Sequence, residues 1–128
     1  MSLSCIIIDD EPNAVNLLEI LIHQTTDWQL LAKCYDALEA MAFLKKNKVD
    51  FIFLDINMPK MDGLQLLASL KGSPQWHNIP VVMITTEGGE AKVSEAVRLG
   101  AAGYVRKPFT ADQIKEKLTG ILEPVLPL

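Results

Sequence analysis

A fully apolar segment that ends in a carboxylate and a proline turn constrains the fold of this chain more than any other feature. Phe51 to Leu54 form an unbroken apolar run, which is typical of a strand buried on both faces. Asp55 follows at once, and Pro59 and Gly63 then interrupt regular structure. Asp55 is therefore expected at the C-terminal end of a buried strand, the edge at which open parallel sheets bind ligands.

Short apolar segments alternate with amphipathic segments along the whole chain. The apolar segments predict strands at residues 3–8, 28–34, 51–54, 81–84 and 103–106. Apolar spacing of three and four residues, with start and stop residues, predicts helices at about 12–22, 36–46, 63–71, 90–99 and 110–122. This alternation predicts an α/β fold of the flavodoxin-like, doubly wound (βα)5 type. Its parallel five-stranded sheet would have the order 2-1-3-4-5 and helices on both faces.

Length and composition limit the number of domains and the class of partner. The 128 residues fit a single domain, with a core over about 3–122 and a tail or linker stub at 123–128. The formal net charge of −4 argues against direct binding of nucleic acid. Without a signal peptide or an apolar run of roughly 18 residues, we expect no membrane contact and a cytoplasmic location. Cys5 and Cys34 are expected to be free, buried thiols.

Five polar residues lie where the predicted strands end. Asp9 and Asp10 follow the first strand, Asp55 the third, Thr85 the fourth and Lys107 the fifth. The first and third strands are neighbours in the predicted order, so their three carboxylates should converge. Two carboxylates about 4 Å apart repel by roughly 4 kcal/mol at an effective dielectric near 20, so the site requires a cation. Oxygen ligands of this kind suit Mg²⁺.

This arrangement is suited to phosphoryl transfer. With a metal ion bound, an oxygen of Asp55 can attack phosphorus and form an acyl phosphate. The metal would take one phosphoryl oxygen, Lys107 would pair with a second, and the Thr85 hydroxyl could donate to a third. Each residue alone has a plainer explanation as a turn former, a helix cap or a surface charge. Independent turn formers, however, have no reason to gather at one edge with complementary charge.

The motifs around these residues resemble those of response-regulator receiver domains of two-component signal transduction, of the chemotaxis-regulator kind. The resemblance covers nearly the whole chain and rests on four motifs in the family's order. They are Ile8-Asp9-Asp10-Glu11, Leu54-Asp55-Ile56-Asn57-Met58-Pro59 with Asp62-Gly63, Ile84-Thr85, and Tyr104 with Lys107-Pro108-Phe109.

The resemblance implies a phospho-acceptor and a metal site. Asp55 would accept the phosphoryl group. Asp10, Asp55 and the backbone carbonyl of Asn57 would hold Mg²⁺, while Asp9 would act mainly through water. Asn57 and Glu87 would flank the phosphoryl group and tune its hydrolysis.

The resemblance also implies a conformational switch. Lys107 would contact the phosphoryl group, and a cis peptide bond between Lys107 and Pro108 would aim the lysine inward. Thr85 and Tyr104 would form the switch pair. Thr85 would move onto a phosphoryl oxygen, and Tyr104 would pack inward and change the surface around it.

The implied partners belong to a phosphorelay. A sensor histidine kinase or a histidine phosphotransfer protein would supply the phosphoryl group, and the chain would catalyse only its own phosphorylation and dephosphorylation. Output would reach a downstream protein or a C-terminal effector domain missing from this chain, and a homodimer could form through the predicted helix at 90–99, strand at 103–106 and helix at 110–122. The expected output face includes Ala91, Lys92, Glu95, Tyr104, Ile114 and Lys117.

Two other classes of function compete with this interpretation. A phosphatase of the haloacid-dehalogenase kind also forms an aspartyl phosphate, but it needs Asp-x-Asp after its first strand. Here Asp55 follows the third strand and Asn57 replaces the second acid. The other alternative is a phosphorylation-independent protein-interaction module with a receiver fold. That alternative would need Asp10, Asp55 or Lys107 to be missing, and all three are present.

Overall fold

The computed structural model describes residues 3–25, 28–56, 58, 62–85, 90–107 and 112, and its elements follow the predicted alternation. The strands are β1 (Ser4–Ile8), β2 (Gln29–Cys34), β3 (Phe51–Asp55), β4 (Val81–Thr85) and β5 (Gly103–Arg106). The helices are α1 (Pro12–Thr25), α2 (Ala37–Lys46), α3 (Gly63–Lys71) and α4 (Glu90–Arg98). The fifth predicted helix, 110–122, lies outside the described residues except for the helical Asp112.

The five strands form one parallel sheet in the order β2-β1-β3-β4-β5, which confirms the predicted flavodoxin-like topology. β3 is central, and all five of its residues are buried. Ile8 on β1 lies opposite Leu54 on β3, so the residues that follow these two strands begin at the same level of the sheet. This register brings Asp9 and Asp55 to one edge.

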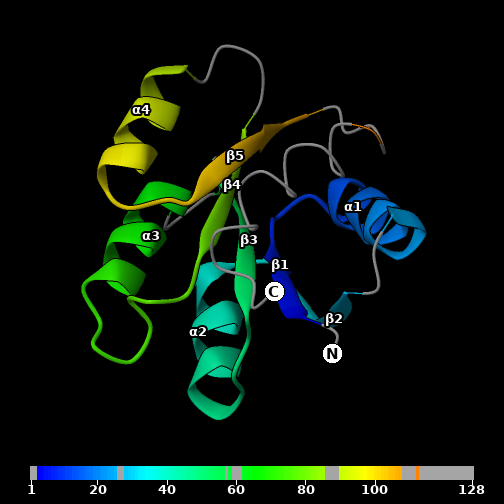
Figure 1. Ribbon diagram of the computed structural model, residues 1–128, viewed down its shortest axis with the longest axis horizontal. Helices are drawn as coiled ribbons and strands as arrows, with labels where there is room; N and C mark the ends of the chain where they lie inside the picture. The colour runs from blue at the N-terminus through cyan, green and yellow to red at the C-terminus, as the bar shows by residue number, and fades with distance from the viewer. Residues whose placement is uncertain are drawn as a thin grey trace.

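The sheet separates two apolar layers, because successive side chains along each strand point to opposite faces. Figure 1 shows α1 on one side of the sheet and α2, α3 and α4 on the other. Ile52 and Leu54 face the layer of α2, α3 and α4, whereas Phe51 and Phe53 face the layer of α1. β3 therefore contributes apolar side chains to both layers, as its unbroken apolar sequence predicts.

Helix boundaries follow local capping chemistry. The Asp36 side chain accepts a hydrogen bond of 2.8 Å from the backbone N–H of Glu39, which confirms the predicted start of α2. After α4, Gly100 has a φ of 108°, a conformation that favours glycine, and the helix ends close to the predicted boundary at residue 99. Asp62 and Gln65 form a capping box at the start of α3, an interaction that the sequence analysis missed.

Both cysteines are free and buried, as predicted, and they lie on opposite faces of the sheet. Burial raises the pKa of the Cys5 thiol to about 12, with a further contribution from Asp50. Burial likewise raises the pKa of the Cys34 thiol to about 11. Both groups are therefore protonated at neutral pH.

Among the helices of the described ranges, none has the length and apolar character that crossing a membrane requires.

Gly63 lets the first turn of α3 lie directly against the end of β3. Its backbone N–H donates to the Ile56 carbonyl at 2.9 Å. A Cβ at this position would lie 2.7 Å from Ile56 Cα and 2.8 Å from the Asp55 carbonyl carbon, and it would overlap the Asp55 carbonyl oxygen. Because backbone cannot move aside as a flexible side chain can, only glycine fits beside Asp55.

We therefore expect Gly63→Ala to lower the free energy of unfolding by about 1–3 kcal/mol, the usual cost of overpacking. Gly72→Ala is the matched control. Gly72 has a φ of −83°, and its nearest contact would be 3.3 Å away, so we expect a change of less than about 1 kcal/mol there. Urea denaturation of both variants measures the difference, and equal losses would contradict the close-approach explanation.

Candidate functional site

Three carboxylates meet at the C-terminal edge of the sheet, as the sequence predicts. Oxygen atoms of Asp9, Asp10 and Asp55 all lie within 4.8 Å of one another. Asp9 and Asp55 are buried, with side chains 1% and 3% exposed, whereas Asp10 is exposed. The cluster therefore consists of two buried side chains and one exposed side chain.

Hydrogen bonds to the backbone position Asp9 and Asp55, the residues that carry the two buried carboxylates. Asp9 donates its N–H to the Cys34 carbonyl at 3.0 Å, and its Oδ1 accepts the backbone N–H of Glu11 at 3.0 Å. This turn holds the Asp9 side chain over the end of β1. Asp55 is the last residue of β3, and the next residue, Ile56, still donates to the Ile84 carbonyl at 2.9 Å. Hydrogen bonding between β3 and β4 therefore continues past Asp55 and holds its backbone in place.

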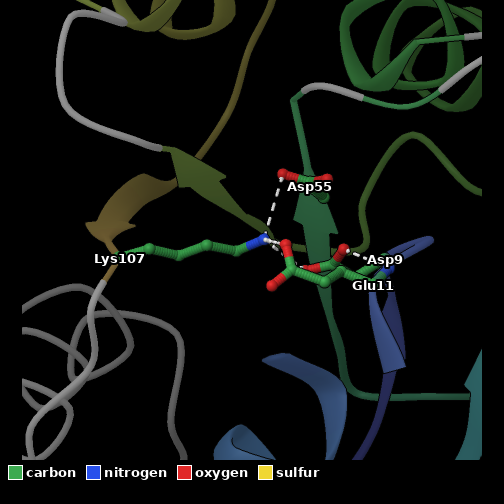
Figure 2. A network of polar contacts seen from close by, with 4 residues as sticks. All are labelled: Asp9, Glu11, Asp55 and Lys107. Carbon is green, nitrogen blue, oxygen red and sulfur yellow. Dashed lines mark hydrogen bonds and ion pairs between the residues drawn. The ribbon is translucent and has the colours of Figure 1, made fainter. Parts of the chain in front are cut away.

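Lys107 enters the same site from the end of β5. Figure 2 shows its side chain extending toward the carboxylates of Asp9, Glu11 and Asp55. Its Nζ lies 3.0 Å from Asp9 Oδ2, 3.5 Å from Glu11 Oε2 and 4.0 Å from Asp55 Oδ1. Its backbone N–H donates to the Thr85 carbonyl at 2.8 Å, so the base of the side chain is tied to the end of β4.

The electrostatics of the cluster keep Lys107 charged. Burial on its own lowers the pKa of Lys107, but the hydrogen bond with Asp9 and the attraction of Asp55, Asp9 and Glu11 outweigh it. The net effect raises the pKa of Lys107 above its ordinary value. One ammonium does not neutralise Asp9, Asp10, Asp55 and Glu11, so the described part of the site retains excess negative charge. The donors are carboxylate oxygens, the set that a hard cation such as Mg²⁺ prefers.

Thr85 and Tyr104 lie on neighbouring strands beside this cluster. Thr85 is the last residue of β4 and is buried, and Tyr104 on β5 is half-buried opposite Met83. Met83 faces the layer of α2, α3 and α4, and Tyr104 packs against that layer. Strand alternation places Thr85 on the face of Met83, so the predicted switch pair shares one face.

Part of the predicted site and output face lies outside the described residues: Asn57, Glu87, Pro108, Ile114 and Lys117. Within the described part, Ala91, Lys92 and Glu95 are exposed on α4. The α4 part of the predicted output face is therefore exposed to solvent, whereas Tyr104 on β5 is half-buried.

Glu11 belongs to this site, although no role is predicted for it from the sequence. It is the third acid of the run after β1, and its side chain is 60% exposed yet reaches Lys107. The run of three acids was the available signal, because the third acid extends the cluster along the same turn.

Comparison with known proteins agrees with the fold. The sequence profile of the response regulator receiver domain family matches residues 5–119. The chain belongs to this family. Receiver domains bind Mg²⁺ at an acidic site, and the carboxylates of Asp9, Asp10 and Asp55 lie close enough together to hold a metal ion here. Receiver domains also interact with histidine kinases and downstream targets.

The individual relatives include chemotaxis proteins. The chain is 43% identical over 88 residues to the chemotaxis protein CheY-3 of Vibrio cholerae, covering 69% of this chain and 68% of that protein. It is 38% identical over 94 residues to the chemotaxis protein CheY of Pseudomonas aeruginosa, covering 73% and 76%. Among solved structures, the receiver domain of NtrX from Brucella abortus superposes with a TM-score of 0.84 at 30% identity. That match covers 93% of this chain and 98% of the other.

We expect Lys107→Met to lower the free energy of unfolding by about 1–3 kcal/mol at pH 7 in EDTA, because it leaves the buried carboxylates without their cation. The folded-state pKa of Lys107 is raised, so its contribution is complete below the unfolded pKa of about 10.4. The contribution is then lost as the pH rises through the higher folded pKa. Above pH 7 the difference between wild type and variant should therefore persist until strongly alkaline solution, where it should shrink.

Lys48→Met removes the same charge from an exposed position and is the control. Urea denaturation across the pH range measures both variants. A loss in Lys107→Met no larger than in Lys48→Met would show that the cluster does not depend on the ammonium.

Proposed function

We propose that this receiver domain accepts a phosphoryl group on Asp55 and uses it to change its affinity for a protein partner. The observation that carries the proposal is a buried Asp55 at a fixed strand end, with Asp9, Asp10 and the Lys107 ammonium around it. In the reaction an Asp55 oxygen forms a bond to phosphorus. The bond from phosphorus to the donor breaks, and the donor leaves with that electron pair.

The described residues have different roles in this reaction. Lys107 neutralises charge on the phosphoryl oxygens as a compact cation, and Thr85 donates its hydroxyl to another oxygen. Asp10 and Asp55, with the Asn57 carbonyl, would hold Mg²⁺, which when bound neutralises phosphoryl charge. Asp9 would act through water, and its two engaged oxygens support an indirect role: Oδ1 accepts from Glu11 and Oδ2 pairs with Lys107.

The donor would be a sensor histidine kinase or a histidine phosphotransfer protein, and the chain would turn over no other substrate. The formal net charge of −4 supports an output through protein contacts rather than through nucleic acid. We place the chain in the cytoplasm as a single domain over 1–128, an assignment that the two free thiols support. Asn57 and Glu87 would tune the lifetime of the acyl phosphate. A phosphorylation-independent interaction module is the alternative.

Intact mass after incubation with acetyl phosphate and Mg²⁺ tests the acceptor site. We expect wild type to gain one phosphoryl group, and we expect Asp55→Asn and an EDTA-treated sample to gain none. Asp50→Asn changes an exposed acid at the opposite end of β3 and should be phosphorylated like wild type. Folded wild-type protein that gains no mass would favour the interaction module.

The switch would pass from the phosphoryl group through Thr85 to Tyr104 and the exposed face of α4. Phosphorylation would draw the Thr85 hydroxyl toward the site, and Tyr104 would fill the space on the same face of the sheet. The surface of α4, β5 and the fifth helix would then bind a downstream protein, an effector domain or a second copy of the chain.

The sequence contains two tyrosines, so fluorine-labelled tyrosine gives two NMR signals, one from the switch and one from Tyr35. We expect phosphorylation to shift the Tyr104 signal and leave the Tyr35 signal in place. Thr85→Ala should still be phosphorylated but should lose most of the Tyr104 shift. Thr85→Ser keeps the hydroxyl, so it should retain the Tyr104 shift. A full shift in phosphorylated Thr85→Ala would exclude Thr85 as the link.

A further inference from the structure

Three carboxylates surround the Lys107 ammonium, and they differ in freedom to move. Asp9 and Asp55 are buried and held by backbone hydrogen bonds at the ends of β1 and β3. Glu11 approaches the same Nζ at 3.5 Å, but its side chain is 60% exposed. Of the three, only the Glu11 carboxylate can swing into solvent without leaving a buried charge behind.

An ammonium has three donor hydrogens, and three carboxylates lie within 4.0 Å of this one. A phosphoryl group on Asp55 would bring new anionic oxygens to the same Nζ. At 4.0 Å the Asp55 contact is an ion pair and not a hydrogen bond, so the new oxygens would compete chiefly with the Asp9 and Glu11 contacts. The Asp9 contact is the shortest at 3.0 Å and is buried, so releasing it is costly. The Glu11 contact is exposed to water, and exposed ion pairs are weak.

We propose that Glu11 is a positioning residue that holds the Lys107 ammonium in the resting protein and releases it to the phosphoryl group. This inference rests on the proposed function, since it concerns the loading of Asp55. The Glu11 charge also lies at the solvent side of the site, where an anionic donor approaches. Glu11 therefore slows loading in two ways: it occupies the lysine, and it repels the donor.

Two small phosphoryl donors allow the occupation of Lys107 and the repulsion of the donor to be measured separately at pH 7. In acetyl phosphate an Asp55 oxygen bonds to phosphorus as acetate leaves with the electrons of its bond to phosphorus. In phosphoramidate the leaving group is ammonia, which departs with the electrons of the nitrogen–phosphorus bond. Acetyl phosphate is a dianion and phosphoramidate a monoanion, so repulsion by Glu11 acts more strongly on acetyl phosphate. The contact of Glu11 with Lys107, in contrast, slows phosphorylation by both donors.

We expect Glu11→Gln to be phosphorylated by acetyl phosphate about two- to fivefold faster than wild type at low ionic strength and saturating Mg²⁺. The increase should be smaller with phosphoramidate and should shrink in high salt, because salt screens exposed charges. Glu11→Asp keeps the negative charge but has a shorter side chain. It should therefore show only the part of the rate increase that comes from freeing Lys107. Glu39→Gln removes one exposed charge from α2 and is the control.

A second readout needs neither Mg²⁺ nor donor. The NMR signal of the Lys107 ammonium nitrogen should shift, and its hydrogens should exchange faster, in Glu11→Gln but not in Glu39→Gln. An unchanged Lys107 signal, or a Glu11→Gln loading rate equal to or below that of Glu39→Gln, would overturn the proposal. If wild type itself gains no phosphoryl group, the acceptor function fails, while the NMR comparison still decides whether Glu11 holds Lys107.

Discussion

Repulsion among carboxylates at one end of a parallel sheet is the constraint from which the rest of the site follows. The ends of β1 and β3 are adjacent, so Asp9 and Asp55 are buried side by side with Asp10 close to both. Unpaired buried charge is costly, and Lys107 offsets part of that cost from the end of β5. The charge that remains makes the edge a site for a hard cation and for the transfer of an anionic group.

The fold could be predicted in detail because its local signals agree with one another. The apolar run of β3 has no polar alternation, and in the structure its side chains fill both layers. Asp36 before α2 and Gly100 after α4 mark helix ends through chemistry that depends on neighbours in sequence. The site could be located for a related reason, since parallel strands place all their C-terminal ends at one edge.

Other features could not be predicted because they depend on side-chain reach rather than on spacing. The sequence predicts that Lys107 contacts the phosphoryl group, yet in the unmodified chain its Nζ lies nearer to Asp9, at 3.0 Å, than to Asp55, at 4.0 Å. The approach of Glu11 to Lys107 joins residues 96 positions apart, and no local pattern specifies it. The capping box of Asp62 and Gln65 has a local signal in the Asp-x-x-Gln spacing, but Asp62-Gly63 is equally typical of a break in regular structure.

The two thiols affect how the molecule can be handled. Cys5 and Cys34 lie on opposite faces of the sheet, so they cannot reach each other to form a bridge while the fold persists. With pKa values of about 12 and 11 they hold almost no thiolate at neutral pH, and thiolate is the form that reacts with maleimides. The two native thiols should therefore react little with a maleimide label at neutral pH. A single cysteine introduced on the exposed side of α4 could carry a spectroscopic probe without removing either native thiol.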